Sequence, residues 1–174
     1  MAGLSTKYIE NLIKTIMLDS RNFIGVLSCD MFLRMTKIKK INLSPGKGII
    51  LNLSSSNHPG SHWVAIYLNS DDIVEFFDSF GLHCFDSNIL EAFDDQKLGV
   101  IDFKKRLQHE ESQFCGYYCV AWLLCREVNI SSDIFGSFFN EKNLMQNDHI
   151  CTEIIKTFIE MRAEELIKEY NGKR

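Results

Sequence analysis

The chain has 174 residues, of which 45% are hydrophobic and 24% are charged, and its net charge at pH 7 is −4. This length suits one domain with a substantial core, so we expect residues 1–174 to form a single domain that acts as a monomer. An acidic chain lacks the basic footprint of nucleic-acid-binding proteins. No apolar run approaches the ~20 residues of a transmembrane helix, which excludes membrane-spanning functions.

Six cysteines are scattered along the chain, and their setting decides between a disulfide framework, a metal site and free thiols. The N-terminus has the pattern of an amphipathic helix and not of a secretory signal peptide. Cys119 and Cys125 lie on one apolar stretch, and their spacing is unlike that of C-x-x-C metal pairs. We therefore expect free thiols in a reducing intracellular compartment, with neither a metal nor a cofactor.

Apolar residues recur with helical spacing in some segments and form short strand-like runs between turn residues in others. In the first third of the chain we predict a helix over 5–18 with Ser5 as N-cap, a loop over 22–27 that contains Gly25, a short helix that begins at Ser28 or Asp30 and ends at Met35, and a turn at 44–46. Strands follow over 49–53, 64–68 and 73–78, then a helix over 88–93 and a strand over 99–103 that 104–107 extends. The rest of the chain is predicted to form helices over 115–128 and 132–139 and a last helix that begins at Asn147 or Asp148.

Two of these helices carry most of the predicted helical core. The segment 115–128 is apolar on nearly all sides, which indicates a buried central helix. The last helix has an apolar stripe that we expect to pack inward. The members of this stripe are Ile150, Ile154, Ile155, Phe158, Met161 and Leu166.

The strands 64–68 and 73–78 form a predicted antiparallel hairpin, joined by a turn at 69–72. His62 precedes one strand and Asp78 closes its partner, so both belong to the same end of the sheet. A histidine held by a carboxylate is an oriented general base. The alternative is that His62 is a hydrogen-bonded strand-edge histidine and that Asp78 only forms a turn before Ser79 and Gly81.

A polar loop over 108–114 runs into Cys115-Gly116 at the start of the central helix. Ser112 or Gln113 can cap this helix, which places Cys115 in its first turn, where a thiolate is favoured over a thiol. Gly116 leaves room for a substrate backbone beside the sulfur. The alternative is that Cys115 is simply a small core residue.

These residues resemble the adenovirus-type (adenain-like) cysteine proteases, and most closely the versions in polintons, adintoviruses and virophages, which are relatives of the SUMO and ubiquitin-like-protein proteases. The resemblance rests on His62-Trp63, on the segment 76–81 with Asp78, on Gln108 and on Cys115-Gly116, in the order His, acid, Gln, Cys. It implies an α+β fold, a papain-like variant in which a small mixed or antiparallel sheet packs on a central buried helix that carries the nucleophile. N- and C-terminal helices flank this core.

The resemblance implies a role for each of these residues. His62 would be the base, Asp78 the acid in place of the adenoviral Glu, and Cys115 the nucleophile. Gln108, seven residues before Cys115, would share the oxyanion hole with the Cys115 backbone N–H. Gln113 lies too close to Cys115 to match and should cap the helix or face solvent. Trp63 either packs on the sheet as a strand aromatic or covers these residues.

The implied function is a cysteine endopeptidase that processes capsid or other virion proteins near small, Gly-rich residues, in the host cytoplasm or nucleus or in the virion. The adenoviral enzyme uses DNA and a disulfide-linked peptide as activators. The acidic charge and the lack of a cysteine near Lys97 argue against that dependence here. The alternatives are a protease of SUMO or other ubiquitin-like modifiers, an acyltransferase with the same residues, and a catalytically silent capsid-associated protein.

Overall fold

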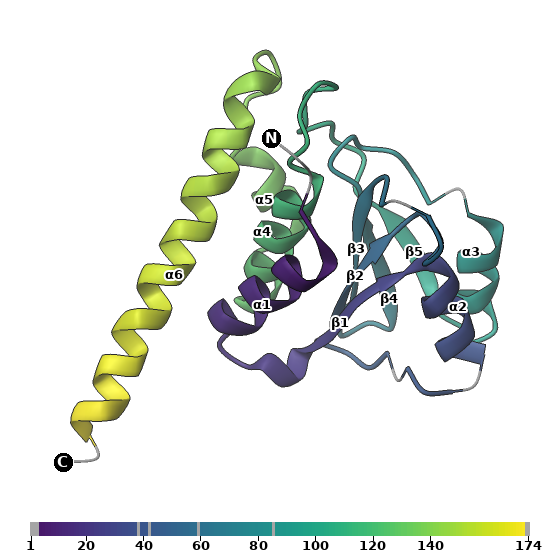
Figure 1. Cartoon of the computed structure of the whole chain (residues 1–174), viewed down its shortest axis with the longest axis horizontal. Coiled ribbons are helices and arrows are strands. Elements are labelled where there is room, and N and C mark those ends of the chain that lie inside the picture. The colour runs from purple at the N-terminus through teal and green to yellow at the C-terminus, as the bar shows by residue number, and fades with distance from the viewer. Residues whose placement is uncertain (1–3, 38, 42, 59, 85, 173–174) are drawn as a thin grey trace.

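The structure is a computed structural model that describes residues 4–37, 39–41, 43–58, 60–84 and 86–172. A five-stranded mixed sheet lies at its centre, with helices on both faces (Figure 1). The strands, in their order across the sheet, are β1 (Phe23–Ser28), β2 (Gly48–Asn52), β3 (Trp63–Leu68), β4 (Ile73–Phe77) and β5 (Gly99–Asp102). The central pairs β2–β3 and β3–β4 are antiparallel, and β1–β2 and β4–β5 are parallel.

Two groups of helices cover the two faces of this sheet. Figure 1 shows α1, α4, α5 and α6 on one side, and α2 and α3 on the other. The bounds of the helices are α1 (Thr6–Ile16), α2 (Cys29–Lys37), α3 (Ser87–Asp94), α4 (Cys115–Glu127), α5 (Ser132–Ser137) and α6 (Asn147–Gly172), with short 3₁₀ turns at Ser20–Asn22 and Leu144–Gln146. Within the described residues, no helix has both the length and the hydropathy needed to cross a bilayer.

The alternation of side chains along β3 divides the apolar core into two clusters. Trp63, Ala65 and Tyr67 join the cluster under α1, α4 and α6. Val64 and Ile66 join the opposite cluster under α2 and α3. All six residues of β3 are buried, because helices cover both faces of the central strand. The hairpin that precedes the site is therefore a rigid part of the core.

The predicted central helix is confirmed as α4, which lies in the middle of the larger core cluster. Ten of its residues are buried, including Tyr118 and Trp122 with no exposed surface. The Trp122 ring stacks on Phe77 of β4, with ring centroids 5.0 Å apart and planes inclined by 13°. This contact fixes the helix that begins at Cys115 against the strand that ends next to Asp78.

The prediction of a loop over 22–27 is wrong, because these residues form β1 and pair with β2 in parallel. Gly25 has a φ of +152° and lies at an irregularity in the pairing between Phe23 and Gly25. Such a bulge interrupts the alternating pattern by which a strand is recognised in a sequence. The strand forms because Phe23 and Val26 are buried in the core.

Two further expectations fail at the ends of elements. Residues 104–107 do not extend β5, although Leu107 N–H and Gln108 N–H both donate to the Ser79 carbonyl (2.8 and 3.0 Å). In α6, Phe158 is buried as expected, whereas Met161 and Leu166 are 43% and 49% exposed. Figure 1 shows the reason, since the C-terminal part of α6 runs past the body that its first half packs against.

Gly81 and Gly46 offer a test of the turn that follows β4. Both have left-handed backbones, with φ of +72° and +84°, but only a Cβ at Gly81 would meet backbone, at 2.8 Å from the Lys105 carbonyl carbon. We expect Gly46→Ala to lower the free energy of unfolding by about 1 kcal/mol and Gly81→Ala by about 3 kcal/mol, measured by urea denaturation. Equal losses would show that the approach of residues 105–106 does not constrain this turn.

Candidate active site

His62 and Asp78 meet at one end of the β3–β4 hairpin, as their places in the sequence predict. His62 immediately precedes β3 and Asp78 immediately follows β4, and the antiparallel pairing of Ala65 with Phe77 brings the two ends together. The His62 Nε2 and Asp78 Oδ2 atoms are 3.0 Å apart. Leu53 N–H donates to the His62 carbonyl at 3.0 Å and ties this end of the strand to the segment after β2.

The Asp78 carboxylate is held by more than the imidazole. Its side chain is 1% exposed, and its Oδ1 accepts the Phe80 N–H at 2.7 Å. The Gly81 N–H donates to the Asp78 carbonyl at 2.9 Å, which closes the turn. The Phe80 ring then lies over His62, with ring centroids 5.1 Å apart. Asp78 therefore both forms the turn, which was the alternative to the acid role, and contacts His62.

Cys115 is the first residue of α4, it lines the same cleft as His62, and its interaction with the imidazole contributes to the raised pKa of His62. The expected caps at Ser112 and Gln113 are wrong, because the N-cap position is Phe114 and no side chain of the described residues caps it. The Ser112 hydroxyl instead accepts the Phe114 N–H at 3.2 Å, before the helix begins. The helix start therefore keeps its N–H groups, which favour negative charge, beside the sulfur.

The surroundings of His62 favour its charged form. Burial by itself lowers the pKa of His62, but hydrogen bonds and charge interactions with Asp78 and Cys115 outweigh it and raise the pKa from 6.5 to about 9. An imidazolium is thus stabilised by the Asp78 carboxylate and the Cys115 thiol. Burial has the opposite consequence for the other thiols, whose pKa it raises. These thiols are Cys29, Cys84, Cys119, Cys125 and Cys151, with pKa values of about 11 for Cys84 and about 12 for Cys125.

Gln108 lies in the same cleft as His62 and Cys115. The cleft has a volume of about 490 Å³, and His62, Trp63, Gln108 and Cys115 all line it. The Gln108 side chain is 1% exposed, its Oε1 accepts the Ser79 hydroxyl at 2.6 Å and its Nε2 donates to the Ser112 carbonyl at 2.7 Å. Gln113 also lines the cleft but is exposed, as expected for a residue that faces solvent.

Of the two residues expected to form a substrate groove, Trp63 lines the cleft and Gly116 does not. Trp63 is the first residue of β3, is 6% exposed and both packs in the core and lines the cleft. Gly116 is buried and does not line the cleft, which corrects the expectation of a substrate-groove residue. A Cβ at Gly116 would lie 3.0–3.3 Å from Ile9, Leu4 and Trp63, so the glycine allows α1 to approach α4.

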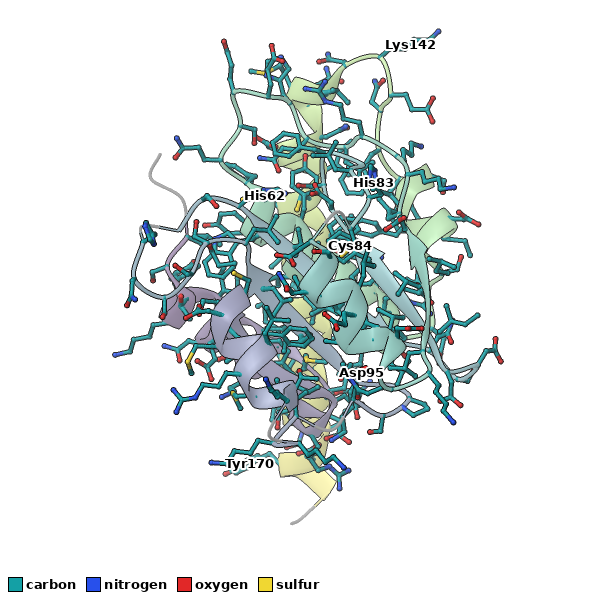
Figure 2. All side chains as sticks on the ribbon, turned by 90° about the vertical axis from the view of Figure 1, so that its right-hand side faces the viewer. His62, His83, Cys84, Asp95, Lys142 and Tyr170 are labelled. Carbon is teal, nitrogen blue, oxygen red and sulfur yellow. The ribbon has the colours of Figure 1, made fainter. Side chains whose placement is uncertain are left out.

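Three polar residues that hold these groups have no functional signal in the sequence, namely Ser79 and Ser112, which bond to Gln108, and Asp148, which bonds to Ser112. Asp148 had only the signal of a helix start. Figure 2 shows that His62 lies far from Tyr170, so the C-terminal end of α6 does not reach the site. Among the described residues, no cluster of three or more His, Cys, Asp or Glu side chains could hold a metal ion.

Comparison with known proteins shows the fold. No protein-family model and no curated protein matches the sequence. The crystal structure of the ASFV pS273R protease is similar with a TM-score of 0.56 and 19% identity, covering 86% of this chain and 67% of that one. The SUMO protease Ulp1, with its catalytic cysteine oxidised to a sulfenic acid, is similar with a TM-score of 0.51 and 16% identity, covering 90% and 79%. The α+β architecture with its five-stranded mixed sheet is therefore the Ulp1/adenain-like cysteine protease fold.

Proposed function

We propose that the protein is a cysteine endopeptidase. The observation that carries the proposal is the His62 imidazole, which is bonded to the Asp78 carboxylate and shares one cleft with the Cys115 thiol where α4 begins. A nucleophile, a base and a group that orients the base are the three parts that cysteine-dependent acyl transfer needs. The fold shared with two proteases supports the same conclusion.

The chemistry follows from these three groups. His62 holds the proton taken from the Cys115 thiol as an imidazolium, in keeping with its raised pKa, and the thiolate attacks the carbonyl carbon of the scissile peptide. Collapse of the tetrahedral intermediate breaks the C–N bond, and the His62 imidazolium gives its proton to the leaving amine. A water molecule then loses a proton to His62 and attacks the thioester, which releases the carboxylic acid and restores the thiol. Asp78 holds the ring and stabilises the imidazolium throughout.

The oxyanion of the intermediate needs donors that are in place before the reaction. We propose the Cys115 backbone N–H and the Gln108 side-chain amide for this role. The place of Gln108 in the cleft supports this, and so does its bond from Ser79, which occupies the amide oxygen and fixes the side chain, while the N–H₂ group donates to Ser112. Buried, oriented dipoles of this kind need no reorganisation during the reaction.

The proposed substrates are virion proteins of a virus or virus-like element related to polintons, adintoviruses or virophages, cleaved near small residues such as glycine. The sequence resemblance and the likeness to the ASFV protease support this choice. We extend the proposal to an enzyme that acts as a monomer inside the host cell or in the virion. The likeness to Ulp1 favours one second candidate, a protease of SUMO or other ubiquitin-like modifiers.

The experiment that tests the function compares these substrates directly. The protein and its Cys115→Ala variant are incubated with the structural proteins of the same genetic element and, separately, with a precursor of a ubiquitin-like modifier. New termini are then mapped by mass spectrometry. Cleavage of the first set by the parent alone supports virion processing, and cleavage of the modifier alone selects the second candidate. Acetylated product in the presence of an acyl donor selects an acyltransferase, and no reaction with either set contradicts the proposal.

Cys115 should be the reactive thiol of the six. Cys115 lies at a helix start in the cleft that His62 lines, whereas burial raises the pKa of the other five thiols. We expect a limiting amount of iodoacetamide near pH 6 to alkylate Cys115 almost alone, as measured by peptide mapping. Cys115→Ala should then show only slow, scattered labelling. Even labelling of all six cysteines in the parent would argue against an activated nucleophile.

The titration of His62 should report its contact with Asp78. Because its folded pKa of about 9 lies above the ordinary 6.5, the charged ring stabilises the folded protein fully below pH 6.5, and this contribution disappears as the pH rises through about 9. We expect the His62 ring resonances to titrate near pH 9 by NMR. Asp78→Asn should move this midpoint to lower pH, since it removes the carboxylate. An unchanged midpoint would mean that Asp78 does not support the imidazolium.

The two glutamines of the loop should differ in kinetics. Gln108→Ala should lower kcat by roughly a hundredfold or more with KM nearly unchanged, because the lost bond forms mainly in the transition state. Gln113→Ala is the matched control and should leave turnover almost unaffected, since Gln113 is exposed. Both variants are measured on a peptide taken from a mapped cleavage site. An inactive Gln113→Ala beside an active Gln108→Ala would show that the oxyanion donor has been assigned to the wrong residue.

A further inference from the structure

The first turn of α6 contacts the loop that joins Gln108 to Cys115, although the two are far apart in the sequence. Asp148 lies in this turn, and its Oδ2 accepts the Ser112 hydroxyl at 2.7 Å. Its Oδ1 accepts the Tyr118 hydroxyl at 3.0 Å. One carboxylate thus links the loop before the nucleophile to the first turns of the helix that carries it.

Ser112 has a complete set of hydrogen bonds, and Asp148 determines how they are arranged. A hydroxyl has one hydrogen to donate and two lone pairs that accept. The hydrogen goes to Asp148, and the oxygen accepts from Phe114 N–H at 3.2 Å and from Gln108 Nε2 at 3.3 Å. Because a carboxylate can only accept, it obliges the Ser112 hydroxyl to point its hydrogen away from Phe114 and Gln108.

The two groups that Ser112 contacts are those next to the proposed oxyanion donors. Gln108 is held at its amide oxygen by Ser79 and at its amide nitrogen by the Ser112 carbonyl and hydroxyl. Phe114 directly precedes Cys115, so its N–H bond sets the backbone from which the Cys115 N–H projects. The Ser112 hydroxyl therefore contributes to the orientation of both donors.

The neighbouring residue of α6 holds the other side of Gln108. Asn147 is fully buried, and its Nδ2 donates to the Leu107 carbonyl at 2.8 Å. The same side chain accepts from Asn140 N–H at 2.8 Å, which ties the segment before α6 to this point. The first two residues of α6 thus support the chain on both sides of Gln108. Asn147 bonds to the Leu107 backbone, and Asp148 bonds to the Ser112 side chain.

We infer that Asp148 is a positioning residue for the oxyanion hole, acting through Ser112 on the Gln108 amide and on the backbone at Cys115. The inference rests on the proposed cysteine-dependent acyl transfer. Asp148 touches neither the His62–Asp78 pair nor the sulfur in any hydrogen bond of the described residues. Its loss should therefore weaken the stabilisation of an oxyanion and leave the nucleophile active.

Asp148→Asn tests this with almost no change in size. The asparagine amide offers two donors in place of one carboxylate oxygen, so it can turn the Ser112 hydroxyl around and direct its hydrogen toward Phe114 and Gln108. Asp133→Asn is the matched control, because Asp133 is the acidic residue in the first turn of α5 and the substitution removes the same charge from a helix start.

Two small reagents separate the two properties of the site. p-Nitrophenyl acetate acetylates the thiolate through a tetrahedral oxyanion and releases p-nitrophenolate, whereas iodoacetamide alkylates it by displacing iodide with no oxyanion. We expect Asp148→Asn to lower the rate of Cys115 acetylation by about tenfold or more, and to leave its rate of alkylation within about twofold. Asp133→Asn should change neither rate.

Ser112 supplies a second pair of variants if Asp148→Asn does not fold. Ser112→Ala should reproduce the selective loss of acetylation, and Ser112→Thr, which keeps the hydroxyl, should restore it. Equal losses of acetylation and alkylation, or no loss in either Asp148→Asn or Ser112→Ala, would overturn the inference. A parent protein whose Cys115 reacts selectively with neither reagent would instead overturn the proposed function, so the two failures are distinct.

Discussion

The contact between β4 and α4 is the constraint on which the site depends. Phe77 stacks on Trp122 at 5.0 Å, and Glu75, two residues earlier on the same face of β4, pairs with Arg126 at 2.9 Å. An aromatic stack and a largely buried ion pair hold one strand against one helix in a single register. Asp78 follows this strand and Cys115 begins this helix. Their separation is therefore set by core packing, which deforms little, and not by the flexible loops that carry most functional residues.

The charged groups of the site are buried, so the protein must compensate for their lost hydration. Asp78 is 1% exposed and the His62 side chain is 17% exposed, so an unpaired charge on either would cost several kcal/mol. The attraction between the two opposite charges offsets this cost, and the Phe80 N–H donates a further hydrogen bond to the carboxylate. The start of α4 places its N–H groups beside the sulfur. The groups that would carry out acyl transfer are also the groups that make the buried charges tolerable.

Helix α6 has two parts with different physical roles. Its first half is packed against the core through Cys151, Ile155 and Phe158, and its first turn donates and accepts hydrogen bonds around the loop 107–114. Its second half extends past the body, with Ile167 and Leu166 exposed (Figure 1). The loop itself has little regular structure and needs partners for its polar groups. The start of α6 supplies them, which makes a distant segment part of the site's support.

The sequence by itself determined the hairpin and the central helix, and its resemblance to known proteases pointed to His62, Asp78, Gln108 and Cys115. In the structure His62, Gln108 and Cys115 line one cleft, and Asp78 is bonded to His62. The hairpin and the helix are local features, because strand alternation, turn residues and an apolar helix are each written in one short segment. Only the tertiary structure decided that residues 23–28 pair as a strand, that Gly116 packs against α1, and that Asp148 reaches Ser112. Each of these depends on partners far away in the chain. A pattern within one segment cannot specify which distant backbone completes a sheet edge, fills the space beside a glycine or satisfies a hydroxyl.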